Sequence, residues 1–176
     1  DGQHDSVEGL DAGCRMTVDP AIPDHLRRLS IRREFDAPRA LIWKMWTDPA
    51  HVAVWWAPEH FTTPRVEMDV RPGGAIHVVM RGPDGTDHPF DGRFVALDQP
   101  ERLVMRTWVT YADGAIWFEV EQTVRLEEVD GRTVQHFHAE VVAAEADALG
   151  PLRGMEAGWT GSLDKLEVHV RAVMAR

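Results

Sequence analysis

The stretch GPLRGMEAGWTGSLDKLEVHVRAVM, residues 150–174, decides the fold that we predict for this chain. Apolar residues recur in it at steps of three and four, which places them on one face of an α-helix. They are Leu152, Met155, Trp159, Leu163, Leu166, Val170 and Val173. At ~1.5 Å per residue such a helix is roughly 35 Å long. It therefore needs a broad apolar surface to pack against, and the strand-like stretches before it can supply one.

Glycines weaken this helix beside its largest apolar side chain. Gly154, Gly158 and Gly161 flank Trp159, and each glycine costs a helix about 1 kcal/mol relative to alanine. They also leave bare backbone where other residues would carry side chains. We expect the helix to close over a curved sheet and to leave an apolar hollow between helix and sheet.

The composition is typical of one folded domain. The chain has 176 residues, of which 44% are hydrophobic and 27% charged, enough to bury one substantial core. A net charge of −10 without a basic cluster argues against nucleic acid and anionic membranes as partners. No apolar run is long enough to span a membrane. The single cysteine, Cys14, excludes an internal disulfide and fits a cytoplasmic location.

The domain organisation follows from local composition. Residues 1–24 are rich in Gly, Asp and Pro, and we expect a weakly structured extension there that packs loosely or wraps around the domain. His4 and Cys14 in it are interpreted as bystanders. Residues 25–176 are expected to form a single domain.

The first half of that domain begins with a strand and two helices. Residues 25–35 alternate as a strand does, and helices are expected at 39–46 and 50–55. Asp36 is interpreted as the N-cap of the first helix, with Pro38 at its first position. Thr47-Asp48-Pro49 repeats the same signal. The neighbours Trp55 and Trp56 cannot share one inward direction, so we expect one to pack inward and the other to lie at a rim.

The second half alternates apolar and polar residues in six strands joined by short turns, at 64–70, 76–80, 90–97, 103–110, 116–128 and 133–142. Strands joined by short turns pair antiparallel. Gly92 suggests a bend. The facing of the last strand stays open, because Phe137 and Ala139 favour one side and His136 and His138 the other. The predicted class is α+β, in the order β-α-α-β6-α, with a curved antiparallel sheet wrapped around the long C-terminal helix.

Several short motifs come in a fixed order along residues 25–173. They are Trp55-Trp56-Ala57-Pro58, Asp69-Val70-Arg71-Pro72-Gly73-Gly74, Met80-Arg81-Gly82-Pro83-Asp84-Gly85, Pro100-Glu101-Arg102-Leu103, and Gly158-Trp159 with Leu163 and Leu166. Together they resemble the SRPBCC (START-like, Bet v 1-like) superfamily, and within it the activator of Hsp90 ATPase homologue (AHSA1)-like family. The resemblance implies the helix-grip fold, in which the sheet grips the C-terminal helix around a cavity. The superfamily includes lipid and hormone binders, polyketide cyclases and chaperone activators.

Our first functional hypothesis is the binding of a small hydrophobic or aromatic ligand in the hollow, without a cofactor or a metal. The expected ligand-binding residues come from the strand faces, the first two helices and the last helix. They are Trp46, Trp55, Met68, Ile76, Val78, Met80, Phe90, Phe94, Met105, Phe118, Val120, Gln122, Met155 and Trp159. The competing interpretation is that these side chains simply fill the core, as methionines and aromatics at strand spacing usually do.

Two other functions use the same residues differently. A polyketide cyclase, dehydratase or hydrolase needs a buried acid or base, for which only Gln122, His138 and Glu140 are polar candidates. No catalytic residue can be assigned from this. A chaperone-associated regulatory module would use a surface outside the hollow, and an exposed Trp55 or Trp56 would equally suit a homodimer. His136 and His138 lack a third metal ligand at a suitable spacing.

Overall fold

A computed structural model describes residues 17–176 and confirms the predicted α+β class. Within these residues, seven strands form one antiparallel sheet in the order β1-β7-β6-β5-β4-β3-β2. The strands are β1 (Arg28–Phe35), β2 (Thr62–Met68), β3 (Ala75–Arg81), β4 (Asp87–Asp98), β5 (Arg102–Thr110), β6 (Ile116–Val129) and β7 (Arg132–Ala144). The helices are η1 (Asp24–Leu26), α1 (Arg39–Thr47), α2 (Pro49–Trp55), η2 (Ala146–Ala148), α3 (Leu149–Arg153) and α4 (Met155–Met174).

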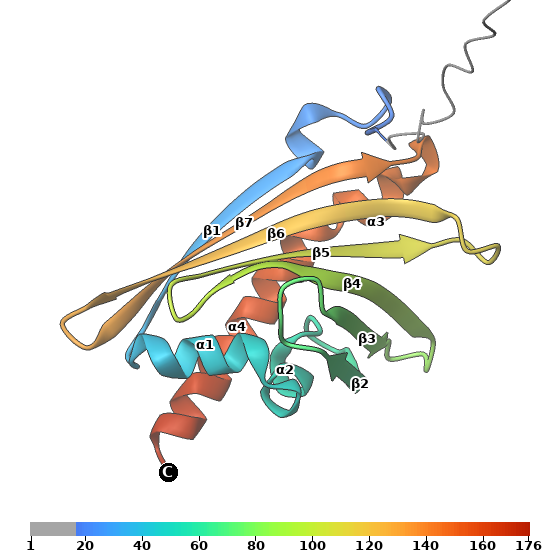
Figure 1. Cartoon of the computed structure of the whole chain (residues 1–176). Coiled ribbons are helices and arrows are strands. Elements are labelled where there is room, and N and C mark those ends of the chain that lie inside the picture. The colour runs from blue at the N-terminus through green and yellow to red at the C-terminus, as the bar shows by residue number, and fades with distance from the viewer. Residues whose placement is uncertain (1–16) are drawn as a thin grey trace, which may run out of the picture.

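The sheet curves around the C-terminal helix (Figure 1). Strands β2 to β7 follow one another as hairpin neighbours, while β1 pairs with the last strand, from Arg28 opposite Glu140 to Phe35 opposite Thr133. Helices α1, α2 and α4 lie on the same side of the sheet, and α4 crosses it diagonally (Figure 1). This is the helix-grip arrangement that the sequence predicts.

A glycine permits the bend in the middle of the sheet, as predicted. Gly92 on β4 lies opposite Thr107 on β5. A Cβ atom at Gly92 would lie 2.4 Å from the carbonyl oxygen of Arg106, a distance that real side chains do not adopt. The register shifts nearby, between Phe94 and Ala96, which is the mark of a β-bulge and increases the local twist.

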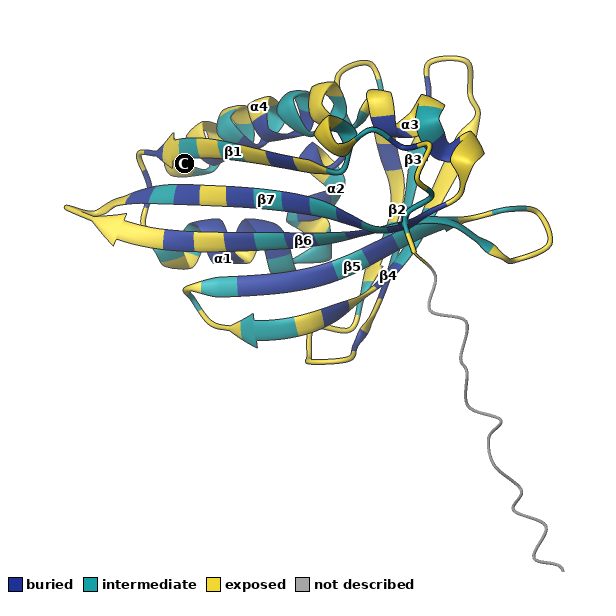
Figure 2. Cartoon of the chain, turned by 90° about the horizontal axis from the view of Figure 1, so that it is seen from above, coloured by how far each residue is buried: buried dark blue, intermediate teal, exposed yellow. Residues whose placement is uncertain are grey.

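The alternation of buried and exposed side chains settles the facing of β7. Phe137 and Ala139 are buried, whereas His136 is exposed, and Figure 2 shows the alternation along this strand. His138 shares the outer face and bonds Ser30 across the strand pair at 2.9 Å. The two histidines therefore point away from the helices.

The predicted helix caps are half right. Asp48 caps α2, because its carboxylate accepts a hydrogen bond from the Ala50 N–H at 2.9 Å and Pro49 follows it. The prediction of Asp36 as the cap of α1 is wrong. Pro38 occupies the cap position without a side-chain bond, and the first helical N–H, of Arg39, donates to Glu128 at 2.8 Å instead. A carboxylate that is distant in sequence replaces the local cap.

The predicted C-terminal helix is divided in two. Gly154 separates α3 from α4, and its N–H donates to the carbonyl of Pro151 at 3.1 Å. Beyond this break the predicted apolar face is correct, since Leu163, Leu166 and Val170 are buried. Gly154 is thus both the C-cap of the short first segment and the N-cap of the long helix.

The segment before β1 contacts the sheet within the described residues. Val18 bridges to Ala144, and Ile22 is fully buried. The Arg27 side chain donates to the carbonyl of Ile22 at 2.9 and 2.6 Å. The predicted domain boundary at residue 24 stays a prediction, and His4 and Cys14 lie outside the described residues. None of the helices in residues 17–176 has the length and hydropathy needed to cross a membrane.

Candidate ligand-binding site

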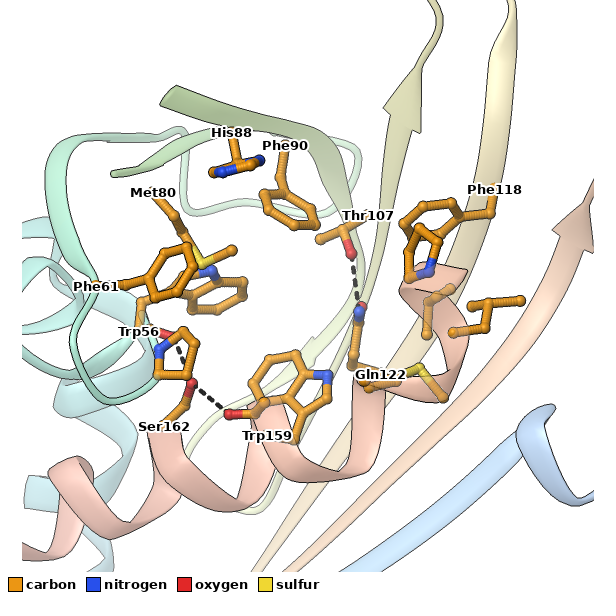
Figure 3. Close-up of a pocket in the computed structure, with 17 residues that line it drawn as sticks. Trp56, Phe61, Met80, His88, Phe90, Thr107, Phe118, Gln122, Trp159 and Ser162 are labelled. Atoms are coloured by element: carbon orange, nitrogen blue, oxygen red, sulfur yellow. Dashed lines mark hydrogen bonds between the residues drawn. The ribbon is translucent and has the colours of Figure 1, made fainter. Parts of the chain in front are cut away.

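A cavity of about 380 Å³ lies between the inner face of the sheet and the C-terminal helices (Figure 3). Its walls come from β3 to β6, from the loop after α2, and from α3 and α4. The lining residues are Trp56, Pro58, Phe61, Met80, His88, Phe90, Thr107, Phe118, Val120, Gln122, Pro151, Leu152, Gly154, Met155, Gly158, Trp159 and Ser162. The wall is mostly apolar and aromatic, which is typical of small-molecule sites.

A cluster of tryptophans holds one side of the cavity. The ring centroids of Trp56 and Trp159 lie 5.3 Å apart at 73°, an edge-to-face contact. Behind them Trp159 packs on Phe137 at 4.4 Å, and Trp46 packs on Trp55 at 4.6 Å. Such contacts stabilise aromatic pairs beyond their buried area. The cavity wall therefore continues directly into the core of the domain.

Half of the predicted ligand-binding residues line this cavity. They are Met80, Phe90, Phe118, Val120, Gln122, Met155 and Trp159. The other predicted residues are Trp46, Trp55, Met68, Ile76, Val78, Phe94 and Met105, and none of them lines it. Most of these are core residues with almost no exposed surface. Alternation identifies the inward face of a strand, but it does not indicate where along that face the packing leaves a space.

The sequence analysis missed part of the wall. Trp56, Pro58 and Phe61 come from the loop after α2, where no periodicity shows facing. The sequence analysis expected one of Trp55 and Trp56 to pack inward and the other to lie at a rim, without deciding which. The structure buries both, with 0% of Trp55 and 5% of Trp56 exposed. The expected exposed tryptophan for a homodimer is therefore wrong. Thr107 could have been predicted from the sequence. It lies two residues after Met105 on β5, on the same face, and it is the partner of Gly92 on β4.

Helix α4 holds the loop wall in place. Ser162 donates a hydrogen bond to the Trp56 carbonyl at 2.6 Å, and Lys165 donates to the Phe61 carbonyl at 3.3 Å. Burial lowers the pKa of the Lys165 ammonium. The loop also lies against the helix at Gly161, where a Cβ would be 3.5 Å from Pro58, an ordinary van der Waals contact. These contacts attach a segment without regular structure to the rigid helix.

A buried polar pair lies in the sheet wall. Gln122 and Thr107 are 2.8 Å apart (Figure 3). With the Gln122 amide oxygen facing Thr107, its nitrogen also donates to the carbonyls of Met105 and Val120 at 3.2 Å. That orientation leaves no polar atom of Gln122 without a partner. The amide is thus committed to the sheet and cannot donate or accept a proton as an acid or base.

The polar candidates for acid–base chemistry lie elsewhere. His138 and Glu140 are on the outer face of β7, where Glu140 pairs with Arg28 at 3.0 Å. His88 is a histidine of the cavity lining, and it is exposed at the edge of the cavity, 5.9 Å from the ring of Phe61. Among the described residues, no group of three or more His, Cys, Asp or Glu is placed to hold a metal ion.

A curved antiparallel sheet that encloses a C-terminal helix and an apolar cavity defines a helix-grip protein. The chain belongs to the family of activator of Hsp90 ATPase homolog 1-like proteins, whose family model matches residues 36–171. This confirms the family that the motifs resemble.

Solved structures share this fold. A protein from Nitrosomonas europaea is 23% identical, with a TM-score of 0.71 over 88% of this chain and 100% of its own. A protein from Chromobacterium violaceum is 26% identical, with a TM-score of 0.72 over 82% of this chain and 96% of its own. The AHSA1 protein from Silicibacter pomeroyi is 22% identical, with a TM-score of 0.68 over 82% and 98%. No curated protein matches the chain significantly.

Proposed function

We propose that this protein binds a small hydrophobic or aromatic molecule in the cavity between the sheet and helices α3 and α4. The observation that carries the proposal is the cavity itself, about 380 Å³ with an apolar and aromatic wall. This volume lies in the range of roughly 300–1,000 Å³ that is usual for small-molecule sites. Membership of a superfamily with ligand-binding relatives supports the same conclusion.

The wall suits an apolar ligand energetically. Each Å² of apolar surface that the ligand removes from water contributes ~25 cal/mol before ordering costs. Aromatic rings such as Phe90 and Phe118 offer stacking faces, and Met80 and Met155 have flexible thioether chains that adapt to ligand shape. Van der Waals contact with these side chains, rather than ion pairing, would hold the ligand.

Filling the cavity from the helix provides the test. Gly158 lines the cavity, and a Cβ added there meets no atom within 4 Å. We expect Gly158→Leu to project its side chain into the cavity and to weaken apolar ligands at least tenfold while the fold persists. The matched control is Ala157→Leu, a neighbouring exposed position on α4 outside the cavity wall.

The measurement is a screen of apolar and aromatic compounds by thermal shift and native mass spectrometry. Hits are then titrated by the change in tryptophan fluorescence, since Trp56 and Trp159 belong to the wall. Circular dichroism checks that both variants are folded. The proposal is wrong if the wild type binds no compound, or if Gly158→Leu and Ala157→Leu bind equally well. Catalysis in the same cavity, a chaperone-associated role, a homodimer and a cytoplasmic location stay predictions.

A further inference from the structure

The cavity wall contains no ionic partner for a charged ligand. Among the described lining residues there is no Asp, Glu, Lys or Arg, and His88 is exposed at the edge. The nearby cation Lys165 lies outside the wall and donates to the Phe61 carbonyl. A buried charge without a partner is strongly unfavourable. The part of a ligand that enters this cavity must therefore be neutral.

Carboxylates lie near one edge of the cavity. Asp84 and the ring of Phe61 both lie close to Gly82. A Cβ added at Gly82 would be 3.0 Å from the Asp84 carboxylate and 3.4 Å from the Phe61 ring. Hydrogen bonds from Thr86 lower the pKa of Asp84, so that it is charged at neutral pH. Asp87 lies beside His88 and pairs with Arg81 at 2.7 Å. Arg81 offsets the charge of Asp87, and the Asp84 carboxylate opposes an approaching anion.

The cation Arg153 near the α3 corner does not supply a buried ionic partner. Arg153 directly precedes Gly154 of the wall, and it is exposed. An ion pair with an exposed arginine contributes only about 0–1 kcal/mol. That is too little to offset the burial of a carboxylate.

Two lining tryptophans carry indole N–H donors, whereas the Thr107 and Ser162 hydroxyls of the wall are already bonded to Gln122 and to the Trp56 carbonyl. The buried indoles of Trp46 and Trp55 donate to Gln135 at 2.8 Å and to the Met45 carbonyl at 3.0 Å. Within residues 17–176, the indole N–H groups of Trp56 and Trp159 make no such bond. Neither nitrogen is a fully buried polar atom without a partner, so both keep some accessible surface, and both residues line the cavity. An indole N–H can donate but cannot accept a hydrogen bond.

We propose that the cavity selects uncharged ligands that carry a hydrogen-bond acceptor, such as a ketone or an ester, and rejects carboxylates and ammonium ions of the same shape. This inference rests on the proposed function, because it names the ligand class of the same cavity. The acceptor end would face the indole donors of Trp56 and Trp159 while the rest of the ligand fills the apolar space.

The test is a set of naphthalenes of similar size at pH 7.5. Methyl 2-naphthoate is neutral with an acceptor, 2-ethylnaphthalene is neutral without one, 2-naphthoate is an anion, and 2-naphthylmethylammonium is a cation. Isothermal titration calorimetry measures each affinity. We expect the ester to bind at least about tenfold more tightly than either ion, and several-fold more tightly than the hydrocarbon.

Substitutions then locate the donor. Trp159→Phe and Trp56→Phe keep an aromatic ring but remove the N–H. We expect at least one of them to abolish the difference between ester and hydrocarbon, while the hydrocarbon still binds. Trp108→Phe, which replaces a tryptophan outside the cavity wall, serves as the control and should leave the difference unchanged.

The outcomes separate the two proposals. If the four compounds bind with equal affinity, or if an ion binds as tightly as the ester, the selectivity is overturned and binding stands. If the ester keeps its full advantage over the hydrocarbon in both indole variants, the role of the donors is overturned. If none of the compounds binds the wild type, the proposed ligand class is overturned, and the wider screen above decides separately whether the cavity binds any apolar molecule.

Discussion

Asp147 accepts hydrogen bonds from two aromatic side chains on the β5–β6 hairpin. The Tyr111 hydroxyl lies 2.6 Å from its carboxylate oxygen, and the Trp117 indole nitrogen lies 2.8 Å from the same oxygen. Because Asp147 belongs to η2, the group joins the hairpin to the segment that leads into α3. The carboxylate also raises the pKa of Tyr111 to about 12, chiefly through the hydrogen bond.

This pKa can be measured directly, because Tyr111 is the only tyrosine of the chain. We expect the tyrosinate absorbance near 295 nm to appear with a midpoint of about 12 in the wild type. In Asp147→Asn the midpoint should fall towards the ordinary value of ~10, since the charged acceptor is gone. Far-ultraviolet circular dichroism at each pH shows that the fold is intact. Equal midpoints in the two proteins would contradict the hydrogen bond.

At the scale of the element, the curvature of the sheet depends on one position without a side chain. Gly92 lies under β5 so closely that a Cβ would approach the Arg106 carbonyl oxygen to 2.4 Å and a Thr107 methyl group to 3.0 Å. Backbone cannot yield as a flexible side chain can. The sequence signal for the bend, a glycine in an alternating strand, therefore had a steric cause.

We expect Gly92→Ala to lower the free energy of unfolding by about 2–3 kcal/mol, as overpacking of a rigid contact does. Gly150→Ala is the control, because a Cβ there meets no atom within 4 Å and alanine favours a helix. Urea denaturation followed by fluorescence measures both changes. A stability of Gly92→Ala equal to that of the wild type would mean that β4 and β5 are less closely apposed than described.

At the scale of the whole molecule, a histidine pair joins two helices that are far apart in the sequence. His51 Nδ1 on α2 and His169 Nε2 on α4 are 2.8 Å apart. Burial lowers the pKa of His169, and the neighbouring charges of His51 and Arg176 lower it further. The fold thus favours neutral His169, and only one of the two facing nitrogens can carry a proton without repulsion.

The sign of the pH effect follows from this direction. The unfolded chain binds more protons at His169 than the folded chain does. The contribution of neutral His169 to the free energy of unfolding is therefore complete above the unfolded pKa of ~6.5 and is lost as the pH falls below it. We expect His169→Gln to lose less stability than the wild type between pH 7.5 and 5.5. Urea unfolding at several pH values measures the slopes, with His136→Gln, an exposed histidine, as the control. Identical slopes in all proteins would refute the assignment.

The sequence by itself determined the class, the order of the elements and the direction of most side chains. The alternation on β6 and the three- and four-residue steps on α4 identified the inward faces, and Asp48-Pro49 marked the start of α2. These signals are local, because the geometry of a strand or helix relates each side chain to its own backbone. Motif order likewise identified the family.

Only the tertiary structure decided which inward side chains border a space. Phe94 and Phe90 share a face of β4, yet Phe94 is fully buried in the core and Phe90 lines the cavity. The difference depends on the bend at Gly92, on the break at Gly154 and on the loop that α4 holds through Ser162. The contacts at Gly92 and Ser162 join segments distant in sequence, and residue periodicity carries no information about such contacts.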